Sequence, residues 1–166
     1  MPYYVWIIIN VLFIIGSVLY IWGAHSYDST VILLGKLLAQ LAILLFLINV
    51  NMYFIFLVIR KSKVRNVKVT LSKLSRKMMR AHIPIALAGT SLIALHAGIM
   101  LFQLGEIIGF FHPKMITGYF AIFMLALTLF AGVLRHKKAS GFRRKFHLMT
   151  AMIFAGVFII HLFLPL

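Results

Sequence analysis

Five long apolar runs, separated by short polar links, limit what this 166-residue chain can fold into. Hydrophobic residues make up 63% of it and the mean hydropathy is +1.06, well above the values of soluble domains. In lipid every backbone polar group needs an internal partner, so apolar runs of about 20 residues form helices. We therefore predict an all-α integral membrane bundle, a single domain over residues 1–166. Its five transmembrane helices cover approximately residues 4–23, 35–59, 82–103, 115–134 and 146–164.

The distribution of charge predicts the orientation of these helices. The net charge is +15, and fifteen of the seventeen Lys and Arg residues fall in two links, residues 60–80 and 135–145. Short cytoplasmic loops are rich in Lys and Arg, so we expect both links inside the cytoplasmic membrane. The N-terminus is then inside and the C-terminus outside. Because the basic residues adjoin apolar helices, they indicate topology and contact with membrane lipid, and we expect no nucleic acid partner.

Other residues refine the expected helices. In the link 60–80, apolar residues recur at helical spacing opposite the basic side chains, which predicts a short helix on the membrane surface. The next helix is expected to begin near His82, with Pro84 in its first turn, where a missing N–H costs little. Amides within the second run need hydrogen-bond partners at membrane depth. They are Gln40, Asn49 and Asn51.

Four histidines lie within two of the runs, His82 and His96 in the third and His147 and His161 in the fifth. Each pair is fourteen residues apart, which spans about 21 Å of helix and returns to within about 40° of the same face. The predicted orientation makes both helices begin at the cytoplasmic side. His82 is then level with His147, and His96 with His161.

Two opposed imidazoles at one depth are the axial ligands of a six-coordinate haem iron. The two levels therefore predict two stacked haems, with all four histidines as metal ligands. The chain has no cysteine, which excludes covalent c-type attachment and leaves two haem b as the expected cofactors. For a single histidine beside a basic link, such as His82 or His147, an interfacial position is the simpler interpretation. The equal spacing and matched depth of all four favour ligation.

The residues between the histidines also suit a cofactor. Gly89 leaves room for a flat macrocycle and for close approach of helices, and Phe154 lies midway between the two levels, where its ring would fill the gap between haems. Ordinary membrane packing also favours Gly and Phe, so this alternative stays open for both. The remaining histidines lie in links, and we expect them at the surface. They are His25, His112 and His136.

Two H-x13-H helices, the third and the fifth, with a basic inner link before the third, resemble the transmembrane domain of ferric reductases and NADPH oxidases. The resemblance covers approximately residues 60–166 and depends chiefly on the four histidines. It implies that they ligate two b-type haems and pass electrons across the membrane. The family usually has a sixth helix and a C-terminal dehydrogenase domain, which these residues lack, together with any glycine-rich dinucleotide fingerprint. A flavoprotein reductase or quinol is therefore expected as a separate donor.

The expected function is electron transfer from a cytoplasmic donor to an external acceptor such as ferric iron or oxygen. One alternative is a haem-bearing membrane anchor of a quinone-linked dehydrogenase. Another is a haem-free small transporter or scaffold, although transport by proton relay is disfavoured because no acid lies in a helix interior. The only acids, Asp28 and Glu106, fall in the external links with His25 and His112. These four residues either attract a cationic acceptor or are ordinary loop residues.

Overall fold

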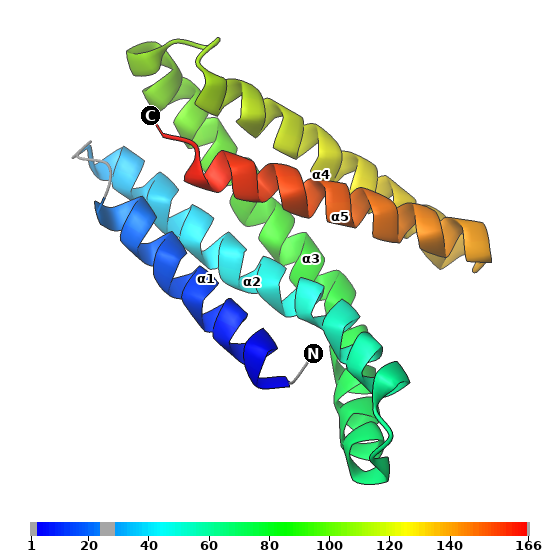
Figure 1. The fold of residues 1–166 in the computed structure, drawn as a ribbon. Helices are drawn as coiled ribbons and strands as arrows, with labels where there is room; N and C mark the ends of the chain where they lie inside the picture. The colour runs from blue at the N-terminus through cyan, green and yellow to red at the C-terminus, as the bar shows by residue number, and fades with distance from the viewer. Residues whose placement is uncertain (1–2, 24–28, 166) are drawn as a thin grey trace. The chain divides into compact units, whose positions relative to one another are not determined.

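The computed structural model describes residues 3–23 and 29–165, and every regular element in that part of the chain is an α-helix (Figure 1). Each of its five helices is long and apolar enough to cross a membrane, as the hydropathy predicted. The fold is that of a multi-pass membrane protein. The helices are α1 (Tyr3–Gly23), α2 (Thr30–Lys61), α3 (Arg65–Ile108), α4 (Pro113–Lys137) and α5 (Gly141–Phe163).

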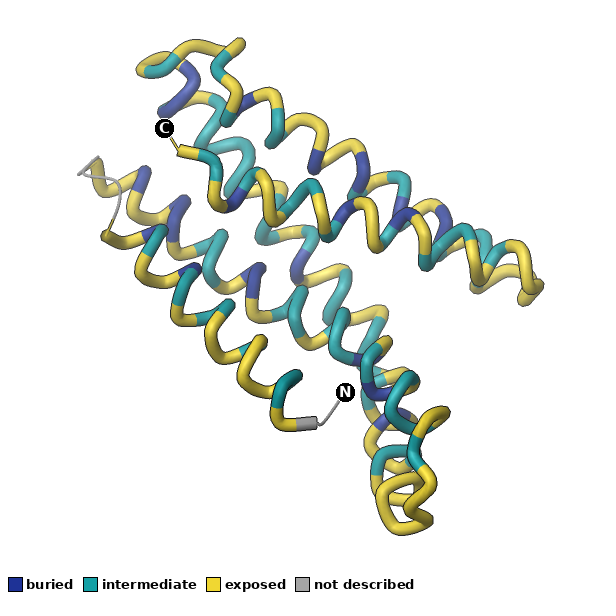
Figure 2. The backbone as a smooth tube through the Cα atoms, in the orientation of Figure 1, coloured by how far each residue is buried: buried dark blue, intermediate teal, exposed yellow. Residues whose placement is uncertain are grey.

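Much of the apolar surface of these helices is exposed. Buried and exposed positions alternate along each helix (Figure 2). Leu19 and Phe102 are 67% and 70% exposed, and many other large apolar side chains resemble them. A soluble protein rarely exposes so much apolar area, whereas lipid chains solvate it without cost.

Helix α3 differs from the prediction. It is continuous over 44 residues, so the basic segment and the apolar run form one helix, and the expected separate surface helix is wrong. Residues 65–83 contain no Gly or Pro, and their Lys, Arg, Leu and Met residues favour helix. Pro84 therefore lies inside the helix and not in a first turn. It removes the usual intrahelical partner of the Arg80 carbonyl. At about 1.5 Å per residue, α3 is about 66 Å long, roughly twice the thickness of a hydrocarbon core.

Local capping explains where the later helices begin and end. After α3, Gly109 has φ +88°, a conformation that favours glycine, and its N–H donates to the Gly105 carbonyl at 3.0 Å. Pro113 then begins α4, where its missing N–H costs nothing. Ser140 caps α5, since its Oγ accepts from the Arg143 N–H at 3.2 Å.

Contacts divide the chain into two compact units, Met1–Gly98 and Ile99–Leu166, with the boundary inside α3. In the first unit α1 and α2 are antiparallel and share two polar contacts. Asn51 Nδ2 donates to Asn10 Oδ1 at 2.9 Å, and Gln40 Nε2 donates to Ser17 Oγ at 3.3 Å. The prediction that the amides of the second run find partners at membrane depth is confirmed for these two.

In the second unit α4 and α5 form an antiparallel hairpin in which each helix caps the other. Arg143 of α5 donates from Nη1 to the Leu134 carbonyl near the end of α4 at 2.8 Å. Lys114 of α4 donates from Nζ to the carbonyls of Leu162 and Leu164 at 3.1 and 2.6 Å. Cations suit helix C-termini because the last carbonyls lack intrahelical donors. The two contacts fix the register of the hairpin at both ends.

The topology is tested with reporter fusions. Fusions after Lys63 and Lys138, which follow α2 and α4, should report a cytoplasmic position because of the basic residues around them. Fusions after Phe110 and Leu166 should report an external one. Paired phosphatase and fluorescent-protein reporters measure this. A cytoplasmic signal after Leu166 would contradict the predicted orientation. The parallel alignment predicted for α3 and α5 would then be reversed or broken.

Candidate functional site

The four predicted histidines all lie on helices and are all partly buried. His82 and His96 are on α3 in the first unit, and His147 and His161 are on α5 in the second. The pairing of His82 with His147 and of His96 with His161 stays a prediction. The geometry around each ring is described within its own unit.

In the first unit both imidazoles are hydrogen-bonded to α2. The Nδ1 atom of His96 lies 2.9 Å from the carbonyl oxygen of Gly35. The Nδ1 atom of His82 lies 3.2 Å from Oδ1 of Asn49, whose Nδ2 also donates to the His82 carbonyl at 3.4 Å. The earlier residue of α2, Gly35, binds the later histidine of α3, and Asn49 binds the earlier one, so the two helices are antiparallel. Gly35 and Asn49 are fourteen residues apart, the same spacing as the two histidines.

In the second unit α4 supplies the partners in the same way. The Nδ1 atom of His147 lies 3.1 Å from the carbonyl oxygen of Thr128. The Nδ1 atom of His161 lies 3.2 Å from the Lys114 carbonyl and 3.2 Å from Oγ1 of Thr117, which itself donates to that carbonyl. Lys114 and Thr128 are again fourteen residues apart. The two helix pairs, α2 with α3 and α4 with α5, therefore repeat one arrangement.

These contacts fix the tautomer of the four rings. A carbonyl or amide oxygen only accepts hydrogen bonds, so in a neutral imidazole the proton must be on Nδ1. The lone pair is then on Nε2 in all four histidines. An imidazole whose Nδ1–H is bound to an oxygen acceptor has Nε2 as its basic nitrogen, which is the tautomer in which histidine commonly ligates metals.

Two glycines on α4 give the α5 histidines access to the helix backbone. Within a helix the carbonyl of residue i is covered by residue i+4, and Gly118 and Gly132 hold that position relative to Lys114 and Thr128. A Cβ atom at Gly118 would lie 3.1 Å from Cε1 of His161, and one at Gly132 would lie 3.4 Å from Cε1 of His147. Because neither glycine has a side chain, each ring can lie flat enough on α4 to reach a carbonyl.

The sequence analysis identified the histidines but missed their partners on α2 and α4. The sequence did contain a pattern that could have indicated these partners. Gly118 and Gly132, on the helix before the fifth run, have the same fourteen-residue spacing as the histidines. Residues 35 and 49 have it on the helix before the third. The main-chain carbonyls that accept the hydrogen bonds could not be identified from residue type, because every residue has one.

The two other predicted cofactor-binding residues lie within the helix pairs. Gly89 is buried against α2, where an added Cβ would lie 3.6 Å from Cβ of Leu45. The close helix approach expected for this glycine is therefore present, while contact with a macrocycle stays a prediction. Phe154 is 5% exposed, and its ring centroid lies 6.1 Å from that of Phe158.

The residues of the polar links have varied positions. His112 caps α4, since its Nδ1 accepts from the Lys114 N–H at 3.2 Å, so it is more than a simple surface residue. His136 is exposed, as predicted, and so is Glu106. The prediction that they fall in links is wrong, because His136 lies in the last turn of α4 and Glu106 in the last turn of α3. His25 and Asp28 lie outside the described residues. Within residues 3–23 and 29–165, no three His, Cys, Asp or Glu side chains converge, and the suggested attraction of a cationic acceptor stays a prediction.

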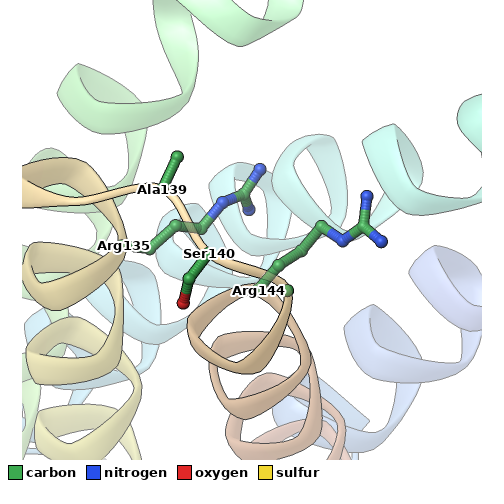
Figure 3. Close-up of a pocket in the computed structure, with 5 residues that line it drawn as sticks. Arg135, Ala139, Ser140 and Arg144 are labelled. Carbon is green, nitrogen blue, oxygen red and sulfur yellow. The ribbon is translucent and has the colours of Figure 1, made fainter.

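The turn between α4 and α5 contains an open pocket of about 380 Å³ (Figure 3). The side chains of Arg135 and Arg144 extend to the same side of this turn. Arg144 comes three residues before His147, so the pocket marks the basic end of the hairpin that carries this histidine. The pocket has no histidine in its lining and is not a haem site. Its lining residues are Arg135, Ala139, Ser140, Gly141 and Arg144.

Comparisons with known protein families, with curated proteins and with solved structures found no match.

Proposed function

We propose that this protein holds two b-type haems and conducts electrons across a membrane. His82 and His147 would hold one haem, and His96 and His161 would hold the other. The observation that carries the proposal is the hydrogen bond at Nδ1 that all four rings share, which makes Nε2 the basic nitrogen that would bind iron. When bound, haem supplies reversible one-electron chemistry, and the protein orients and tunes it.

The main alternative for each ring is a packing histidine whose polar atoms are merely satisfied. That explanation accounts for any one of the contacts. It does not explain why Nδ1 is the hydrogen-bonded nitrogen in all four rings. Nor does it explain why, in both helix pairs, the acceptors have the same fourteen-residue spacing as the histidines. Ligation explains the repetition, because a ligand ring must be held at one tautomer and one angle.

The charged ends of the helices support a direction for electron flow. The positive-inside rule places the basic links in the cytoplasm. The arginine-lined pocket at the end of α5 that carries His147 then offers a cationic surface to an acidic reductase. We propose that electrons enter from a separate cytoplasmic-side donor, a flavoprotein reductase or quinol. They leave to an external acceptor such as ferric iron or oxygen, as the family resemblance implies.

The optical spectrum of the purified protein tests the proposal. We expect sharp low-spin bands in the reduced form and two haem b per chain in a pyridine haemochrome assay. Reduction of both haems by quinol together with a tightly bound flavoprotein would instead favour the dehydrogenase-anchor alternative. A pure, folded and colourless protein from haem-replete cells would contradict haem binding and favour the haem-free transporter or scaffold.

A further inference from the structure

His82 differs from the other three histidines in what holds its ring. His96, His147 and His161 bind main-chain carbonyls, which no side-chain substitution removes, and His161 also lies 3.2 Å from Oγ1 of Thr117. The ring of His82 binds the side-chain amide of Asn49 at 3.2 Å. The same amide also donates to the His82 carbonyl at 3.4 Å, so one side chain of α2 holds both the ring and the backbone of this residue.

The backbone around His82 needs this support. Pro84 lies two residues further along α3 and lacks an N–H, so the hydrogen-bond ladder is one bond short in the turn that contains His82. Proline within a helix also permits bending. The contact from Asn49 therefore holds the ring in a turn of α3 that lacks one backbone hydrogen bond.

We propose that Asn49 is a positioning residue that sets the orientation and the electron-donating strength of the His82 imidazole. This inference rests on the proposed function, since it assigns to Asn49 control over the reduction potential of the haem that His82 would ligate. A stronger acceptor at Nδ1–H makes the imidazole a better donor to iron and stabilises the oxidised state, while loss of the acceptor does the opposite. Asn49 would thus adjust the potential at the level of His82 through its side-chain amide.

The test is a redox titration of the holoprotein followed by its absorbance, with electron paramagnetic resonance of the oxidised form. Asn49→Asp keeps the size of the side chain and offers a carboxylate acceptor, and Asn49→Leu removes the acceptor. We expect one of the two titration steps to move to lower potential in Asn49→Asp and to higher potential in Asn49→Leu. The other step should stay in place. The low-spin signal of the affected haem should broaden in Asn49→Leu because its ligand ring is less fixed.

Asn51 provides the matched control. It is the same residue type on the same helix, but its amide binds Asn10 on α1. Asn51→Asp and Asn51→Leu should leave both potentials unchanged. Unmoved potentials in both Asn49 variants with two haems bound would overturn the role of Asn49 and leave the proposed function intact, as would equal shifts in the Asn51 variants. A wild-type protein that binds no haem would overturn both. If Asn49→Leu fails to fold, the near-isosteric Asn49→Asp still decides.

Discussion

Replacing His82 or His147 with alanine should remove one of the two haems and leave the other low-spin. The reason is that a bis-histidine site loses one of its two iron ligands, while the second level keeps both. The haem content should fall from two per chain to about one, with half of the low-spin absorbance lost. His96→Ala and His161→Ala should have the same effect on the other level. The exposed His136 is the control, and His136→Ala should leave the spectrum unaltered.

Double variants test the pairing itself. His82→Ala with His147→Ala should still hold one haem, because both changes fall on one level. His82→Ala with His161→Ala should hold none, because each level then lacks a ligand. Two retained low-spin haems in all four single variants would show that these histidines are not the ligands. A remaining haem in the second double variant, with none in the first, would show that the levels are paired differently.

The number of helices was predictable because hydrophobicity alone decides which segments enter a membrane. The start of α3 was not. Its residues 65–81 are basic and interrupt the hydropathy, so the sequence analysis treated them as a link with its own short helix. Charge indicates where a chain leaves the membrane, but it does not end a helix, and residues 65–83 contain no Gly or Pro that would favour a break. The position of Pro84 was misjudged for the same reason.

The histidines were predictable from spacing because a fourteen-residue repeat returns to one face of a helix. Their hydrogen-bond partners were not, because Lys114 and Thr128 act through main-chain carbonyls, which every residue has. Asn49 was recognised as needing a partner, but which group it meets depends on the register of α2 against α3. That register is set by packing along the whole helix pair, and it cannot be predicted from the sequence pattern of one helix alone.

Substitution of the glycines beneath the α5 histidines should weaken haem binding although it strengthens the helix. Gly→Ala in a helix ordinarily stabilises by roughly 0.5–1 kcal/mol. At Gly118 the added methyl would lie 3.1 Å from the ring of His161, closer than an ordinary contact, so the ring must shift by a few tenths of an ångström, which we expect to weaken its hydrogen bond to the Lys114 carbonyl. At Gly132 the corresponding distance is 3.4 Å, which α4 accommodates with little shift. Gly118→Ala should therefore lower occupancy of the haem that His161 would ligate more than Gly132→Ala lowers that of the other. Valine should abolish binding at either level.

The direction in which haem content and melting temperature change distinguishes a glycine that serves a haem site from one that serves ordinary helix packing. Gly156 on α5 has open space around its Cα, so Gly156→Ala should keep both haems and leave thermal stability equal or higher. Haem content by pyridine haemochrome and melting temperature in detergent measure the two quantities on the same samples. If Gly118→Ala behaves like Gly156→Ala in both, the close contact between α4 and His161 has no part in holding the ring. If Gly118→Ala raises the melting temperature of the haem-free protein but loses haem from one level, the role of Gly118 is to make room for the His161 imidazole. In that case the missing side chain trades helix stability for a correctly held ligand.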